Sequence, residues 1–65
     1  MKNNIKQLRN ELKISQKDLA ESLSVSRQTI NAIETGKFDP SLTLTITITR
    51  FFKKSLEEIF TMEKQ

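Results

Sequence analysis

The sequence predicts an all-α fold, a small compact domain built from five short helices. Apolar residues recur at helical spacing, as at Ile5, Leu8 and Leu12 near the start of the chain. A serine stands just before each of the four later segments, where its hydroxyl can cap a helix. The single glycine, Gly36, and the single proline, Pro40, bracket a loop in the middle of the chain. These features together mark where the helices begin and end.

The composition excludes several classes of function. The 65 residues contain no cysteine and no histidine, which removes disulfides, cysteine-based metal sites and the commonest general base. There is also no glycine-rich phosphate loop and no close carboxylate pair with a plausible pocket, since the adjacent Glu57 and Glu58 point to different sides of a helix. We therefore predict no enzyme, no metal, no cofactor and no small-molecule ligand. Because there is no signal peptide and no apolar run near 18 residues, we expect a soluble, cytoplasmic protein without a membrane partner.

The positive charge is concentrated in one half of the chain. Residues 1–37 contain seven basic and four acidic groups, a net charge of +3, whereas residues 38–65 contain four of each. Lysines are common on any protein surface, so the bias alone decides little. A positive surface is nevertheless what binding to nucleic acid requires.

A first helix is predicted from a cap at Asn3 or Asn4 to about Leu12. Because Arg9 lies next to the apolar stripe of this helix, we expect it to pair with a buried acidic residue. The alternative is that Arg9 is an unrelated surface charge.

Residues 16–35 predict a helix-turn-helix. Ser15 can cap the first of its helices with help from Asp18, and Ser26 can cap the second. Apolar residues make the facing sides, namely Leu19, Ala20, Leu23, Ile30 and Ile33. The turn is Ser24-Val25, and the outer side of the second helix is polar: Arg27, Gln28, Asn31 and Thr35.

This stretch resembles the Cro/C1-type (XRE-like) repressors and small stand-alone regulators of the cytolysin-repressor type. The matching residues are Gln16, Leu19, Ala20, Leu23, Val25, Ser26, Ile30, Ile33, Glu34, Gly36, Pro40, Ser41 and Leu42. The resemblance covers nearly the whole chain and implies one lambda-repressor-like DNA-binding domain over residues 1–65. It also implies an ion pair between Arg9 and Glu34. The family usually has glycine at the position of Ser24, where a left-handed backbone would cost about 1 kcal/mol.

The exposed face of the second helix of the motif predicts contacts to bases in the major groove. Arg27 can bind guanine and Gln28 adenine, each through two hydrogen bonds. The resemblance implies a further base-contacting position at Ala32, with Asn31 beside it. Contacts to phosphate are expected from Gln16, Lys17, Thr29 and Lys37.

One such helix reads only about four or five base pairs, so a useful operator needs two half-sites. We therefore predict a homodimeric repressor that binds a palindromic sequence in double-stranded DNA. The C-terminal region has more apolar residues than one small core obviously needs, and the interface is expected there: Phe52, Leu56, Ile59 and Phe60. The alternative is that all four are core. The alternative function is an antitoxin or other partner-binding module, which would need a long tail to wrap a partner.

Residues 42–50 depart from the helical pattern. Threonine alternates with leucine or isoleucine from Leu42 to Thr49, which locally favours a strand. As a helix capped by Ser41, the segment 41–53 still presents one apolar face, namely Leu44, Ile48, Phe51 and Phe52. We predict a helix, in which the hydroxyls of Thr45 and Thr49 can bond back to a carbonyl one turn earlier. The strand remains the alternative.

A short last helix is expected after Ser55, with Leu56, Ile59 and Phe60 on its apolar face. Residues 61–65 read as a polar tail. Its first residues could pair with residues 1–3 as a small two-stranded ribbon.

Overall fold

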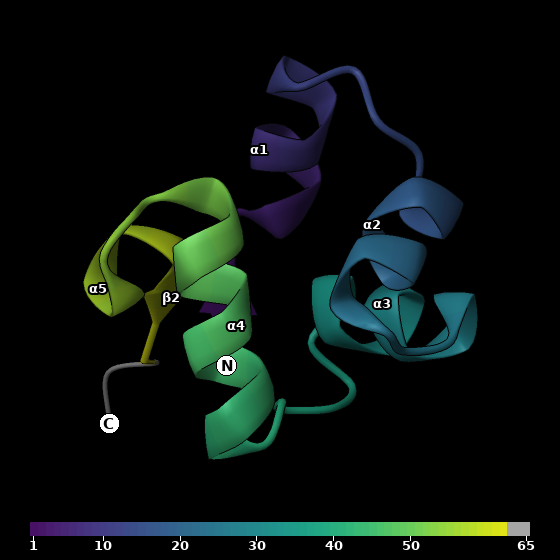
Figure 1. The fold of residues 1–65 in the computed structure, drawn as a ribbon. Coiled ribbons are helices and arrows are strands. Elements are labelled where there is room, and N and C mark those ends of the chain that lie inside the picture. The colour runs from purple at the N-terminus through teal and green to yellow at the C-terminus, as the bar shows by residue number, and fades with distance from the viewer. Residues whose placement is uncertain (63–65) are drawn as a thin grey trace.

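The computed structural model describes residues 1–62, which form five helices and a two-stranded antiparallel sheet (Figure 1). The elements in chain order are β1 (Lys2–Asn3), α1 (Ile5–Glu11), α2 (Gln16–Leu23), α3 (Arg27–Glu34), α4 (Leu42–Phe52), α5 (Leu56–Ile59) and β2 (Phe60–Thr61). The predicted all-α domain and its terminal ribbon are confirmed. The last three residues of the expected polar tail lie outside the described residues.

Serine caps begin four of the five helices. Ser15, Ser26, Ser41 and Ser55 each accept a hydrogen bond from the backbone N–H three residues later, at 3.0–3.2 Å. The side chains of Asp18 and Glu58 in turn accept from the backbone N–H of their capping serine, at 3.1 and 2.8 Å. Hydrogen bonds from the backbone and hydroxyl of that serine hold the pKa of both carboxyls below its ordinary value.

The first helix begins differently. Asn4 occupies the cap position of α1 without a side-chain cap bond, and Asn3 Oδ1 instead accepts from the Ile5 N–H at 3.2 Å.

The turn of the helix-turn-helix is left-handed at Ser24, with φ 58° and ψ 41°. This is the conformation for which the family's glycine is suited, so serine costs about 1 kcal/mol here. Lys13 and Lys53 have the same kind of backbone, at φ 59° and 56°. Three helices of this small domain therefore end in a strained non-glycine residue.

The strand-like segment is the helix α4, as predicted, and the strand alternative is wrong. The threonine hydroxyls bond back to the chain: Thr45 Oγ1 to Ser41 O at 2.8 Å, Thr47 Oγ1 to Thr43 O at 2.9 Å and Thr49 Oγ1 to Ile46 O at 2.7 Å. These bonds satisfy groups that would otherwise disfavour a helix. Burial of Ile48 and Phe52 then decides the conformation in favour of the helix.

All five helices contribute to one core. Its members are Ile5, Leu8, Leu19, Ala20, Leu23, Ile30, Ile33, Ile48, Phe52, Ile59 and Phe60. Three of the residues expected at a dimer interface are therefore buried within the monomer: Phe52 is 9% exposed, Ile59 1% and Phe60 5%. The apolar surface of these three residues is used in the core of the monomer. Leu56, the fourth, is 50% exposed.

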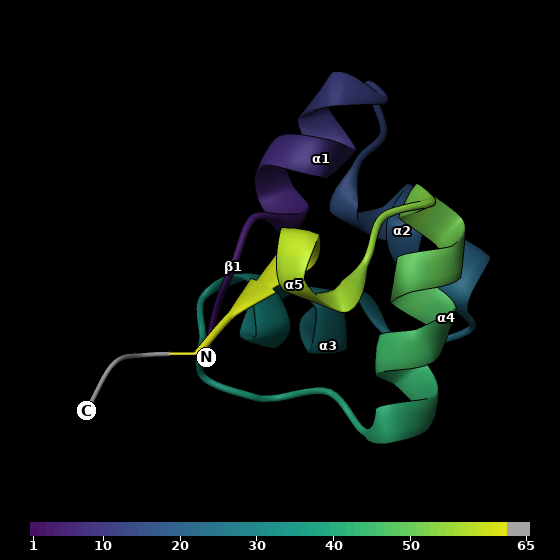
Figure 2. The same ribbon diagram turned by 90° about the vertical axis from the view of Figure 1, so that its left-hand side faces the viewer.

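The last helix is shorter than expected. Phe60 has extended backbone, with φ −112° and ψ 140°, and begins β2 instead of continuing α5. Residues Lys2 and Asn3 pair with Thr61 and Phe60, so both ends of the described chain meet in the ribbon, side by side in Figure 2. Asn3 also donates from Nδ2 to Ile33 O at 2.8 Å, which ties the ribbon to the end of α3.

Figure 1 shows α2 and α3 on one side of the domain and α5 with the ribbon on the other. None of the helices found in residues 1–62 has the length and apolar character needed to cross a membrane.

Candidate nucleic-acid interface

Helices α2 and α3 pack through the buried side chains of Leu19, Leu23, Ile30 and Ile33, and this packing turns the other face of α3 to solvent. Of the expected base-contacting residues, Arg27, Gln28 and Asn31 are exposed. These three and Gln16 line a single hollow in the surface. The structure thus brings together residues from the starts of both helices of the motif.

Ala32, the fourth residue expected to contact bases, is half-buried. Its carbonyl oxygen accepts from the Lys37 and Phe38 N–H groups at 2.9 and 3.2 Å. Its methyl group is the only side-chain atom that it can offer to a base. Through its carbonyl, Ala32 also shapes the loop that follows α3.

The other residues expected at phosphates lie near the ends of α2 and α3. Lys17 is exposed in the first turn of α2, and Lys37 is exposed just past the end of α3, after the left-handed Gly36 (φ 78°). Thr29 is half-buried, and its hydroxyl lies 2.9 Å from Ser26 Oγ, so it is already engaged in the helix cap. The two lysines thus add exposed positive charge at the start of α2 and just after the end of α3.

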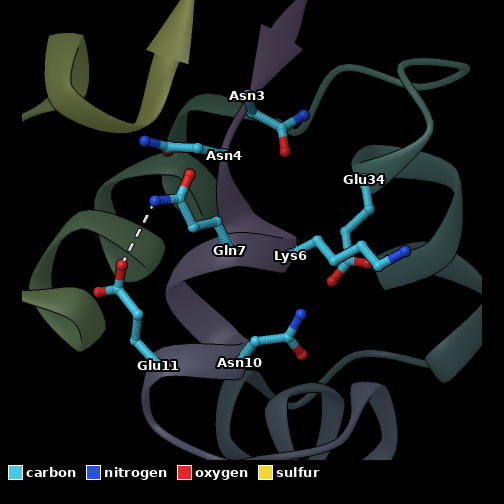
Figure 3. Close-up of a pocket in the computed structure, with 7 residues that line it drawn as sticks. All are labelled: Asn3, Asn4, Lys6, Gln7, Asn10, Glu11 and Glu34. Atoms are coloured by element: carbon cyan, nitrogen blue, oxygen red, sulfur yellow. Dashed lines mark hydrogen bonds between the residues drawn. The ribbon is translucent and has the colours of Figure 1, made fainter.

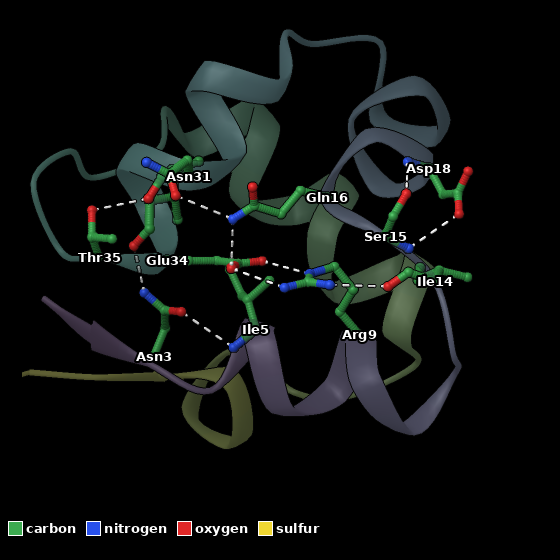
Figure 4. Close-up of polar contacts among 11 residues, drawn as sticks. Asn3, Ile5, Arg9, Ile14, Ser15, Gln16, Asp18, Asn31, Glu34 and Thr35 are labelled. Carbon is green, nitrogen blue, oxygen red and sulfur yellow. Dashed lines mark hydrogen bonds and ion pairs between the residues drawn. The ribbon is translucent and has the colours of Figure 1, made fainter.

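An ion pair between Arg9 and Glu34 lies beneath this face (Figure 4). Arg9 Nε lies 2.8 Å from Glu34 Oε2 and Nη2 lies 3.3 Å from Oε1, while Nη1 donates to Ile14 O at 3.0 Å. The two side chains are only 10% and 4% exposed. The hydrogen bond to Glu34 raises the pKa of Arg9 above its ordinary value.

Gln16 connects the ion pair to the exposed face by hydrogen bonds. Gln16 Nε2 donates to Glu34 Oε1 at 3.1 Å and to Asn31 Oδ1 at 3.2 Å (Figure 4). Sequence reasoning missed both contacts. No pattern in the sequence signals them, because Gln16 and Asn31 lie on different helices and meet only at the observed angle between α2 and α3.

A separate hollow runs along α1 (Figure 3). Its lining consists of amide side chains with one lysine and two glutamates: Asn3, Asn4, Lys6, Gln7, Asn10, Glu11 and Glu34. With Glu34 neutralised by Arg9, Lys6 and Glu11 leave the lining without net charge, and Gln7 Nε2 donates to Glu11 Oε2 at 3.4 Å. This hollow therefore offers no excess positive charge to a nucleic-acid backbone and does not belong to the interface.

Two capped helices, a tight turn and an exposed polar face on the second helix define a helix-turn-helix protein. The helix-turn-helix family model matches residues 5–59, and the chain belongs to the Cro/C1-type (XRE-like) helix-turn-helix family.

Similar proteins cover the full length. A protein of Methanocaldococcus jannaschii is 52% identical over 97% of this chain and 96% of its own. YgzD of Bacillus subtilis is 42% identical, and the match covers 100% of this chain and 98% of YgzD. A protein of Archaeoglobus fulgidus is 37% identical, and the match covers 100% of this chain and 92% of that protein. Each of the three is described as an uncharacterized HTH-type transcriptional regulator.

Proposed function

We propose that this protein regulates transcription by sequence-specific binding to double-stranded DNA, as a cytoplasmic homodimeric repressor on a palindromic operator and without catalysis. The observation that carries the proposal is the placement of Arg27, Gln28 and Asn31, exposed together at the start and middle of α3. The similarity to proteins described as HTH-type transcriptional regulators supports it.

The chemistry of the exposed face fits the major groove. Arg27 can donate twice to guanine O6 and N7, and Gln28 can both donate to adenine N7 and accept from N6. The backbone N–H groups at the start of α2 and the ammonium groups of Lys17 and Lys37 suit phosphates on either side of the groove.

DNA affinity should fall steeply as salt rises, because each lysine–phosphate contact releases a bound counterion. Lys17→Ala and Lys37→Ala should weaken binding to all sequences alike and flatten the slope of log affinity against log salt by about 1 for each contact removed. Fluorescence anisotropy with a labelled duplex over a salt series measures this slope.

Lys54→Ala is the matched control for these lysine variants. Lys54 is exposed in the connection between α4 and α5. Figure 1 shows this connection on the side of the domain away from α3. Its removal changes the net charge equally but should leave the slope unchanged. Equal effects of all three substitutions would show that general charge, and not this face, binds DNA.

Arg27→Ala and Gln28→Ala should each reduce affinity for the best site by about 1–3 kcal/mol and relax the base preference at one position per half-site. Selection of bound duplexes from a randomised pool, repeated for each variant, reads out the preference. Unchanged selectivity in both variants would move the reading residues away from the start of α3.

We place the dimer interface at an apolar groove between the start of α4 and α5. The groove is lined by Met1, Pro40, Leu42, Thr45, Leu56, Glu57, Phe60, Thr61 and Met62. Leu42 is 77% exposed, Leu56 50% and Met62 81%. A second copy of the chain is the fitting occupant, because two copies supply the two recognition helices that a palindrome needs.

Leu56→Lys should therefore shift the protein towards monomer in sedimentation equilibrium while leaving its melting temperature nearly unchanged. Leu12→Lys is the control, since Leu12 at the end of α1 is 53% exposed and lies outside the groove. A wild-type protein that stays monomeric even when bound to DNA would instead favour the partner-binding alternative, with a different protein in the groove.

A further inference from the structure

The side chains beneath the recognition face form a chain of hydrogen bonds whose direction is fixed by chemistry. The Arg9 guanidinium can only donate, and the Glu34 carboxylate, which it neutralises, can only accept. The atom of Gln16 that lies 3.1 Å from Glu34 Oε1 must therefore be the amide nitrogen. An amide oxygen at that place would face a carboxylate oxygen without a proton between them.

The orientation of the Asn31 side-chain amide is fixed in the same way. The Gln16 nitrogen also lies 3.2 Å from the side-chain amide of Asn31, which must then present its oxygen. The two hydrogens of the Gln16 amide are thus both engaged, one by Glu34 and one by Asn31. The Asn31 oxygen is turned towards α2, and its NH₂ group is left as the outward-facing donor of an exposed side chain.

We propose that this relay makes Asn31 a donor-only reader of the major groove, which selects guanine over adenine at its base position. An unconstrained asparagine binds adenine by accepting from N6 and donating to N7. Here the Asn31 oxygen is directed at Gln16 on α2 and its NH₂ group is directed outward, so the amide does not present its acceptor to the adenine N6 donor. Guanine offers two acceptors, O6 and N7, to the outward NH₂ group.

The relay also gives Gln16 a role other than the expected phosphate contact. Because its amide hydrogens are committed to Glu34 and Asn31, Gln16 acts as a positioning residue for Asn31. Its contribution to phosphate binding falls to its backbone N–H in the first turn of α2.

The inference rests on the proposed function, and duplex selection from a randomised pool tests it with the full chain. Asn31→Ala identifies the base position that Asn31 reads, as the one whose preference is lost. In the wild type we expect guanine to exceed adenine there by about tenfold. In Gln16→Ala, whose Asn31 amide can turn over, the ratio should fall below about twofold at that position only.

Asn31→Asp supplies an independent arm. The aspartate can still accept from Gln16, but its outward atom becomes an acceptor, so the preference should move to bases that donate in the major groove, adenine or cytosine. The ratio between bases is measured within one variant, which cancels the general loss of affinity caused by the added negative charge. Circular dichroism melts establish that each variant is folded.

The outcomes separate the two levels of the argument. A wild-type preference for adenine at this position, an unchanged ratio in Gln16→Ala, or no relaxed position in Asn31→Ala would overturn the role of the relay while leaving DNA binding intact. Absence of selected sequences for the wild type would refute the proposed function itself.

Discussion

Arg9→Ala should lower the free energy of unfolding by about 3–5 kcal/mol, the cost of leaving one member of a buried ion pair alone. The substitution strands the Glu34 carboxylate, whose side chain is 4% exposed, and removes the donor that satisfies Ile14 O. At about 0.05–0.15 kcal/mol per residue, the whole domain has only about 3–10 kcal/mol of stability. Urea denaturation followed by circular dichroism measures the loss, and a variant that is unfolded in buffer is within the expected range.

A double variant separates the charge effect from the loss of packing. Arg9→Leu combined with Glu34→Leu removes both charges, so it should be more stable than Arg9→Ala alone. Asn10→Ala, at an exposed position of the same helix, is the control and should change stability little. A melting temperature for Arg9→Ala equal to that of the parent would contradict the energetic role given to this pair.

Ile48→Ala should lower the free energy of unfolding by about 2–5 kcal/mol, because Ile48 is 0% exposed at the centre of α4 and its truncation leaves a cavity. Ile46→Ala is the same chemical change two residues earlier, at a side chain that is 44% exposed. It should alter stability by less than about 0.5 kcal/mol. Thermal melts of the two variants under identical conditions give the comparison.

The pair of variants discriminates between helix and strand in the alternating segment. In a helix two residues apart are rotated by about 200°, so one isoleucine faces the core and the other faces solvent. In a strand both side chains would point to the same face and their truncation would cost similar amounts. Equal losses would therefore contradict α4, whatever their size.

The helix boundaries could be predicted because their causes are local. Each serine cap acts on a backbone N–H only three residues away, and the loop between α3 and α4 is marked by Gly36 and Pro40. For α4, the local propensity of the alternating threonines favours a strand, whereas the apolar face with Ile48 and Phe52 favours a helix. The segment is a helix because burial of these two side chains outweighs the local propensity. The exact end of α5 could not be predicted, because Phe60 is drawn into the ribbon by pairing with Asn3.

The candidate site was predictable as a set of residue types but not as a set of contacts. Exposure of Arg27, Gln28 and Asn31 follows from the helical period of α3. The bonds from Gln16 to Glu34 and Asn31 depend on the angle between two helices, which no spacing encodes. The same limit applies to Phe52 and Ile59, since a count of apolar residues cannot distinguish the core from an interface.

The terminal ribbon sets the order in which the domain can fold. Serine caps and back-bonded threonines involve residues three or four apart, so the helices need no distant contact to begin. Pairing of Asn3 with Phe60 and the bond from Asn4 N to Ile59 O must instead close a loop of almost the entire chain. Loop closure costs entropy that is recovered only when the intervening core has formed. We therefore expect the ribbon to form late in folding, after the helices have packed.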